Sequence, residues 1–151
     1  MVESLNALLL AHERIGVDTN IVIYYIEENP LYLPVIEQIF DAIDEKRNIG
    51  ITSYVTLLEV LVKPMQYNRL DLVELYKEIL TSAFKMILLD ENVAIKAAEL
   101  RAKYKIRTPD SIQIAATIVA NGSLFITNDT KLKRVTDIEV LVLKDIVEQI
   151  Q

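Results

Sequence analysis

The sequence contains no cysteine and a single histidine, His12, among its 151 residues. Without cysteine, disulfides, thiolate zinc sites, iron–sulfur clusters and a cysteine nucleophile are excluded. Acid/base catalysis by two histidines is also impossible, and a Ser-His-Asp triad would depend on His12 alone. Any chemistry must therefore use other side chains. Carboxylates are plentiful, with 22 Asp and Glu against 16 Lys and Arg.

Glycine and proline are scarce too, with three and four residues, which leaves little room for linkers. No apolar run approaches the roughly 20 residues that a membrane helix needs. The apolar start of the chain lacks the positive region of a secretory signal. With 52% hydrophobic residues, we expect a soluble, cytoplasmic protein with one domain over residues 1–151, in which residues 1–12 form a short helical lead-in.

The hydrophobic pattern switches repeatedly between the two periodicities of regular structure. Helical spacing predicts helices that begin near Thr19 and Lys144 and that cover residues 32–47, 70–80, 92–104 and 109–121. A nearly continuous apolar run predicts a buried helix over residues 54–62, ending before Pro64. Short apolar runs predict strands that end at Asp18 and others over residues 48–53, 85–89, 123–127 and 138–143. We also expect Thr108 to cap the helix that starts at Pro109, and Gly122 to end it.

Strands that alternate with helices in this way favour parallel pairing through right-handed crossovers, with helices on both faces of the sheet. The predicted fold class is therefore α/β, a three-layer α/β/α sandwich with a central, mostly parallel sheet of four to five strands.

Two acidic residues follow predicted strands directly. Asp18 ends the first strand, and Asp129 follows the strand over residues 123–127. Because the carboxyl ends of parallel strands share one edge of a sheet, where ligands bind, we expect these two side chains to meet. The alternative for each is a helix N-cap, a role for which Asp is among the preferred residues.

Two further acids lie in predicted helices. Asp110 is in the first turn of its helix, where the helix dipole alone would favour a negative charge. Glu59 lies within an apolar helix, where we expect it to be buried and in need of compensation. A salt bridge to Lys63, four residues later, is the structural alternative.

A divalent cation would account for all four acids together. Mg²⁺ or Mn²⁺ prefers hard oxygen ligands and offsets the repulsion within a cluster of carboxylates. The separations of 41, 51 and 19 residues between successive acids do not form a local motif such as an EF-hand. Such a site would have to be assembled by folding.

Positive charge concentrates around two of these acids. The segment 101–134 carries seven basic residues and only Asp110 and Asp129 as acids, a net charge of +5, whereas the whole chain has −6 and the remainder therefore −11. This distribution favours a polyanionic ligand. Solvated helix faces remain the alternative for some of these residues.

Four blocks of the sequence together resemble the PIN-domain ribonucleases, whose members include VapC-type toxins of toxin–antitoxin pairs. The blocks are VDTN at 17–20, TSYVTLLEVLVKP at 52–64, TPDSIQIAAT at 108–117 and ITNDTKLKRV at 126–135. The resemblance covers residues 15–143. The segment before His12 is additional to many members.

The resemblance implies an endoribonuclease that needs Mg²⁺ or Mn²⁺ and leaves a 5′-phosphate and a 3′-hydroxyl. Its catalytic and metal-binding acids would be Asp18, Glu59, Asp110 and Asp129. Asn20 and Thr127 match polar positions that support the acids or a metal-bound water. An antitoxin partner and a homodimer are implied as well. The RNA backbone would be held by basic residues of the segment, namely Lys105, Arg107, Lys131, Lys133 and Arg134.

A second reading is a non-catalytic PIN-like module that binds RNA or protein and whose acids are structural. Two other α/β classes fit less well. A haloacid-dehalogenase-type phosphatase needs a second acid two residues after Asp18, where this chain has Asn20. A response-regulator receiver needs an adjacent acidic pair at the first strand, which is also missing.

Overall fold

The computed structural model describes residues 4–150, of which 148–150 by their backbone alone, and is built around a five-stranded sheet. All pairings are parallel and the strand order is β3-β2-β1-β4-β5. The strands are β1 (Arg14–Val17), β2 (Ile49–Ser53), β3 (Phe84–Ile87), β4 (Leu124–Thr127) and β5 (Glu139–Val142). The sequence therefore predicted the fold class and the parallel sheet correctly.

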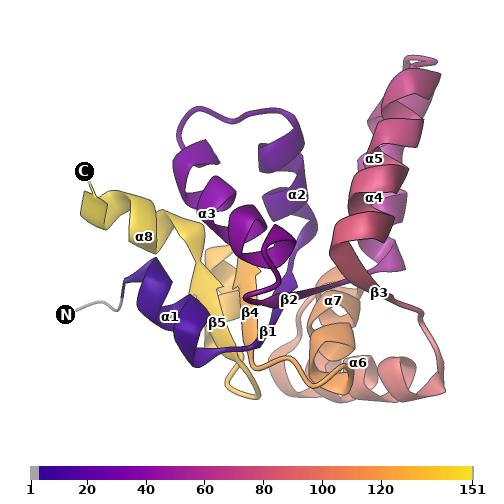
Figure 1. The fold of residues 1–151 in the computed structure, drawn as a ribbon. Helices are drawn as coiled ribbons and strands as arrows, with labels where there is room; N and C mark the ends of the chain where they lie inside the picture. Colours follow the sequence, from indigo (N-terminus) through magenta and orange to yellow (C-terminus); the bar gives the residue numbers. More distant parts are fainter. Residues whose placement is uncertain (1–3, 151) are drawn as a thin grey trace.

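Helices connect the strands and cover both faces of the sheet (Figure 1). They are α1 (Leu5–Ala11), α2 (Thr19–Ile26), α3 (Leu33–Asp44), α4 (Tyr54–Gln66), α5 (Leu70–Ala83), α6 (Glu91–Tyr104), α7 (Thr108–Val119), the short 3₁₀ helix η1 (Thr130–Arg134) and α8 (Leu143–Ile150). In the described part of the chain, none of them is long and apolar enough to cross a membrane.

Two hydrophobic clusters fill the space between the sheet and the helices on its two faces. One contains buried residues of α1, α2, α3 and α8, and the other contains those of α6, α7 and η1. Strand β4 contributes to both, because successive side chains of a strand point to opposite faces. Leu124 and Ile126 belong to the first cluster and Phe125 to the second. This alternation confirms the three-layer arrangement.

One close approach brings α7 against the centre of the sheet. A Cβ atom added to Gly16 of β1 would lie 2.0 Å from Oγ1 of Thr117. Only glycine therefore allows α7 to pack this tightly on β1. The contact places the first turn of α7, with Asp110, near the carboxyl end of the sheet.

The N-terminal lead-in is helical, as expected, over the part that the structure describes; residues 1–3 lie outside it. Ser4 caps α1, and Leu5, Leu8 and Leu9 are buried in the first cluster. The single histidine, His12, bridges Ser123 at 2.7 Å and Glu139 at 2.5 Å. The segment thus packs onto the sandwich and is part of its core.

Several predicted boundaries are wrong. Helix α4 continues through Pro64 to Gln66, because the buried Pro64 ring costs only one backbone hydrogen bond in a helix that packs on α2 and α5. Helix α7 is capped by Arg107, without a side-chain hydrogen bond, and Thr108 is its first residue. The left-handed residue that ends α7 is Asn121, with φ of 65°, and not Gly122. Strand β3 begins at Phe84 and ends at Ile87, so that Leu88 and Leu89 are exposed.

Candidate active site

Asp18 and Asp129 lie at the carboxyl edge of the sheet, because the strands that precede them, β1 and β4, are neighbours. The hydroxyl group of Thr127, the last residue of β4, lies between them. It donates to Oδ2 of Asp18 at 2.7 Å and accepts from the backbone N–H of Asp129 at 3.1 Å. One threonine therefore links both acids, which places it in contact with the residues it was expected to support.

Both acids also cap helices. The alternative role that the sequence suggested for each of them, a helix N-cap, is therefore present as well. Oδ1 of Asp18 accepts from the backbone N–H of Thr19 at 2.9 Å, at the start of α2. Oδ1 of Asp129 accepts from the backbone N–H of Lys131 at 2.9 Å, at the start of η1. Capping uses one carboxylate oxygen of each residue and does not exclude a ligand at the other. In Asp18 that other oxygen also accepts from Thr127, but a carboxylate oxygen has a second lone pair for a ligand.

Asp18 is the acid with the most strongly perturbed ionisation. Burial raises the pKa of its carboxyl group from the ordinary 3.8 to about 6, against the hydrogen bonds from Thr127 and Thr19, which lower it. The negative charges of Asp110 and Glu59 raise this pKa further. A buried carboxylate with acidic neighbours is a place where a cation is favoured.

Asp110 is buried in the first turn of α7 and has a cationic partner. The guanidinium group of Arg107 donates to its two carboxylate oxygens, at 3.0 Å from Nε and 3.4 Å from a terminal nitrogen. Hydrogen bonding to Asp110 raises the pKa of Arg107, as do the charges of Asp110, Asp129 and Glu59. Arg107 thus lies among three of the four acids, where it partly neutralises them.

Glu59 departs from expectation. Its side chain is exposed on α4, so the prediction of a buried carboxylate was wrong. Helix α4 buries the opposite stripe, with Thr56, Val60 and Pro64. The predicted alternative, a salt bridge to Lys63, is also absent from the described ion pairs, since Lys63 contacts Glu27 at 3.8 Å. Glu59 instead accepts a hydrogen bond of 2.7 Å from the hydroxyl group of Thr19.

The described side chains contain no ready-made group of three acidic or histidine ligands for a metal ion. Arg107 engages both carboxylate oxygens of Asp110, so Asp110 would have to release at least one of them to bind an ion. Thr19 engages only Oε1 of Glu59, so an ion could bind at Oε2 without breaking that hydrogen bond. The donor set itself fits Mg²⁺ or Mn²⁺, since it consists of hard carboxylate oxygens. Oδ1 of Asn20 is a buried oxygen without a hydrogen-bond partner. A metal-bound water is one donor that would satisfy it.

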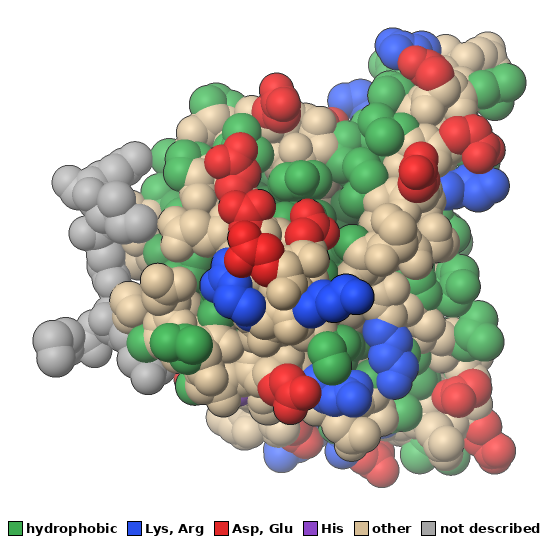
Figure 2. All heavy atoms as spheres, in the orientation of Figure 1, with side chains coloured by type: hydrophobic (Ala, Val, Ile, Leu, Met, Phe, Trp, Pro, Cys, Tyr) green, Lys and Arg blue, Asp and Glu red, His purple; other side chains and the backbone are tan. Residues whose placement is uncertain are grey.

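The basic residues of segment 101–134 fall into two groups. Three of the predicted RNA-binding residues are exposed and form no ion pair within the described residues, namely Lys105, Lys131 and Arg134. The other two are engaged, Arg107 with Asp110 and Lys133 with Asp145 at 2.6 Å. Figure 2 shows a group of basic side chains next to a group of acidic ones on the same face of the molecule.

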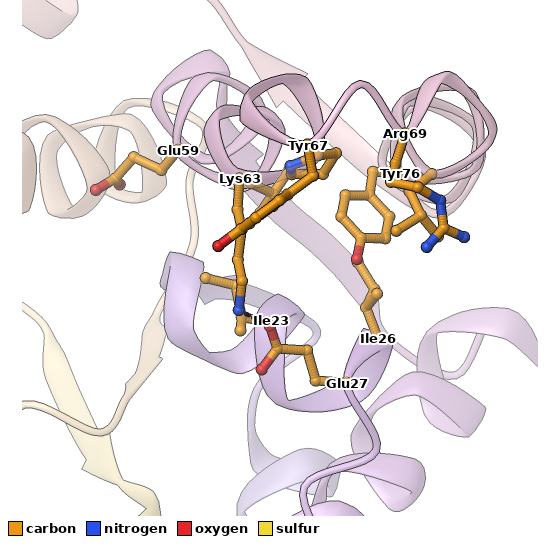
Figure 3. A pocket seen from close by; sticks show the side chains of 11 residues that line it. Ile23, Ile26, Glu27, Glu59, Lys63, Tyr67, Arg69 and Tyr76 are labelled. Carbon is orange, nitrogen blue, oxygen red and sulfur yellow. Dashed lines mark ion pairs between the residues drawn. The ribbon is translucent and has the colours of Figure 1, made fainter.

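An apolar groove of about 360 Å³ lies beside the acids, between α2, α4 and the start of α5. Its lining includes Ile23, Ile26, Tyr67 and Tyr76. Glu59 stands at its end, and in Figure 3 the carboxylate points away from the two tyrosine rings. The groove therefore adjoins the acidic site and shares Glu59 with it.

Sequence reasoning missed a buried polar network next to the acids. It is made of Thr19, Thr52, Ser53, Thr56 and Gln113, all less than a tenth exposed. A signal was present: Gln113 follows Asp110 by three residues, which is the same face of α7, and interrupts an otherwise apolar stretch. A buried amide in such a position must have hydrogen-bond partners.

Comparison with solved structures finds the same fold in toxin–antitoxin proteins. A chain of VapBC2 from Rickettsia felis, solved bound to a DNA fragment from their promoter, is 19% identical, with a TM-score of 0.68 over 85% of this chain and 98% of that one. A chain of a toxin–antitoxin complex from Klebsiella pneumoniae is 22% identical, with a TM-score of 0.64 over 85% and 97%.

A chain of VapBC-1 from nontypeable Haemophilus influenzae is 17% identical, with a TM-score of 0.63 over 87% of this chain and 98% of that one. At these identities the likeness establishes the fold. No curated protein sequence matches the chain. The family model of the PIN domain, however, matches residues 15–138. Together with the parallel sheet and the acids at its carboxyl edge, this match shows that the chain belongs to the PIN-domain family.

Proposed function

We propose that this protein is an endoribonuclease that depends on Mg²⁺ or Mn²⁺ and is the toxin of a toxin–antitoxin pair. The observation that carries the proposal is the arrangement at the carboxyl edge of the sheet. The hydroxyl group of Thr127 bonds the carboxylate of Asp18 and the backbone N–H of Asp129, and Asp110 and Glu59 are near enough to raise the pKa of Asp18. Membership of the PIN-domain family and the likeness to chains of VapBC structures support it.

In this proposal Asp18, Glu59, Asp110 and Asp129 hold the ion. A bound ion of this kind lowers the pKa of a water molecule and neutralises charge that develops on a phosphodiester. The other side chains of the site orient the acids and bind the RNA. Thr127 fixes the carboxylate of Asp18 through its hydroxyl group. The exposed basic residues Lys105, Lys131 and Arg134 contact RNA phosphates, and hydrolysis leaves a 5′-phosphate and a 3′-hydroxyl.

An antitoxin is the proposed protein partner, and the apolar groove between α2, α4 and α5 is its proposed binding site. One similar structure is described as a toxin–antitoxin complex. The groove is lined mainly by aliphatic and aromatic side chains and ends at Glu59. A segment bound there would reach the acidic site. A homodimer and a cytoplasmic location stay predictions.

The test is cleavage of a labelled single-stranded RNA in the presence of Mn²⁺. We expect the wild type to cleave it, and Asp129→Asn to lose activity by about a hundredfold or more, since each factor of ten corresponds to about 1.4 kcal/mol of transition-state stabilisation. Asp71→Asn is the matched control, because Asp71 is an exposed acid of α5 whose ion-pair partner among the described residues is Arg69. It should retain full activity.

Equal cleavage by wild type and Asp129→Asn would contradict the site assignment and indicate a contaminating nuclease. RNA binding without cleavage by the wild type, with Mn²⁺ present, would instead support the second reading, a non-catalytic PIN-like module that binds RNA or protein.

A further inference from the structure

Gln113 lies in the interior, one turn after Asp110 on α7, with only 2% of its surface exposed. Its side chain reaches residues of α2 and of the β2–α4 junction. Burying an amide is costly unless its hydrogen bonds are satisfied. At Gln113 they are satisfied by side chains that lie 57 to 94 residues away in the sequence.

All polar atoms of the Gln113 amide have partners. Nε2 donates to Oγ1 of Thr56 at 2.6 Å and to Oγ1 of Thr19 at 3.0 Å. Oε1 accepts from the hydroxyl group of Ser53 at 2.7 Å. The Ser53 oxygen accepts in turn from the backbone N–H of Val55 at 3.2 Å, which leaves its proton for Gln113. Ser53 therefore sets the orientation of the amide.

The remaining protons of the network can be assigned by counting, because each hydroxyl group has one proton. Thr52 donates to the carbonyl oxygen of Val17 at 3.0 Å. Its 2.8 Å bond with Thr56 must therefore have Thr56 as the donor. With that proton committed, Thr56 cannot donate to Thr19 across the 3.3 Å that separates their oxygens.

The consequence reaches the acidic site through Thr19. Its oxygen accepts from Gln113, and its proton goes to Oε1 of Glu59 at 2.7 Å. Glu59 is exposed, and this is the only hydrogen bond or ion pair that holds its carboxylate within the described residues. The direction of the Glu59 side chain thus depends on a hydroxyl group whose own orientation is set by Gln113.

We propose that Gln113 is a positioning residue: through Thr19 it holds the carboxylate of Glu59 at the acidic site and thereby strengthens the binding of Mg²⁺ or Mn²⁺ there. The inference rests on the proposed function for the identity of the ligand. It assigns Gln113 no contact with the ion or with RNA. Partners of this kind, which orient a ligand without touching the metal, typically contribute about tenfold or more to metal affinity.

The experiment compares Mn²⁺ binding by calorimetry in the wild type and in Gln113→Met, which keeps the length of the side chain but cannot hydrogen-bond. We expect the dissociation constant to rise about tenfold. Ile114→Val is the control for a loss of stability, because Ile114 is a buried residue of the same helix that packs in the second hydrophobic cluster and has no polar side-chain atom. It should leave Mn²⁺ binding unchanged.

A second pair of variants tests whether the effect passes through Glu59. In a Glu59→Gln background, Gln113→Met should change the dissociation constant less than twofold, since the carboxylate it positions is already gone. Thr19→Val should reproduce the effect of Gln113→Met, and Thr19→Ser, which keeps the hydroxyl group, should restore binding.

A full tenfold effect of Gln113→Met in the Glu59→Gln background, or no effect in the wild-type background, would overturn the inference. If the wild type binds no Mn²⁺, the proposed function fails separately. Crystal structures without metal then decide the positioning role, because Glu59 should leave Thr19 in Gln113→Met and stay on it in Ile114→Val. Glu59 unmoved in both variants would overturn the inference as well.

Discussion

The surroundings of Asp18 have opposite effects on the pKa of its carboxyl group. As the cap of α2 it accepts a backbone hydrogen bond, which favours the carboxylate, but its burial beside Asp110 and Glu59 favours the protonated form more strongly. The balance is a pKa of about 6. Without a cation, the charged form of this residue therefore opposes folding at neutral pH.

The pH dependence of stability should show this cost. Because the folded-state pKa of about 6 lies above the ordinary 3.8, the native protein binds more protons than the unfolded chain between these values. The contribution of Asp18 to stability is thus greatest at low pH and falls by roughly 3 kcal/mol as the pH rises through this window.

Asp18→Asn should remove that dependence, because the amide cannot ionise and still caps the helix. We expect the variant to gain stability over the wild type by roughly 1 to 3 kcal/mol at pH 7 and to gain less at pH 4. Urea unfolding in the presence of EDTA measures the difference in stability at both pH values. Asp90→Asn, the same change at the exposed cap of α6, is the control and should show no such pH-dependent gain. A loss of stability in Asp18→Asn at pH 7 would contradict the assignment.

At the scale of elements, α4 presents two different faces. The inward face contributes Thr56 to the polar network and Val60 to the core. The outward face carries an apolar stripe at helical spacing, made of Tyr54, Leu58, Val62 and Met65, which are between 41% and 65% exposed. Exposed apolar stripes of this kind are typical of association faces, and we propose a second copy of the chain as the occupant.

Leu58→Asp should therefore convert a dimer into a monomer, because it places a charge at the centre of the stripe. Light scattering after size-exclusion chromatography gives the mass directly. Leu10→Asp is the matched control, since Leu10 of α1 is 87% exposed and lies outside the stripe. It should leave the dimer intact. A wild type that runs as a monomer at all concentrations would refute the homodimer.

At the scale of the whole molecule, charge is distributed unevenly. The chain carries −6 overall, yet segment 101–134 carries +5. In the folded protein less of this positive charge is available to a ligand, because three of the basic residues form ion pairs with acids, namely Arg107, Lys133 and Lys103. Lys105, Lys131 and Arg134 remain exposed for a polyanion.

Replacing Lys131 and Arg134 together by Ala should weaken RNA binding and flatten its dependence on salt. Each lost phosphate contact on a single strand reduces the slope of log K against log salt by about 0.7, so two contacts give about 1.4. Fluorescence anisotropy over a series of salt concentrations measures the slope. Lys46→Ala with Lys85→Ala, two exposed lysines outside the segment, should leave it unchanged. An unchanged slope in the first variant would assign its two residues to the solvated surface.

Much of the molecule could be predicted from the sequence because the relevant signals are local. Periodicity gave the type and order of the helices and strands, and the parallel arrangement followed from their alternation. The place of Asp18 and Asp129 at one edge of the sheet followed as well, since both residues come after neighbouring parallel strands. Helix ends were less predictable. The core packing that carries α4 through Pro64 is formed with α2 and α5, outside the helix itself.

What the sequence by itself determined is therefore the fold class and the edge of the sheet at which Asp18 and Asp129 lie. Only the tertiary structure decided the side-chain partners of three of the predicted acids: Thr127 for Asp18, Arg107 for Asp110 and Thr19 for Glu59. It also decided that Glu59 is exposed and that Gln113 holds Thr19. The physical reason is that Thr19 and Gln113 are 94 residues apart. Their hydrogen bond exists only because β1 and α7 pack together across Gly16.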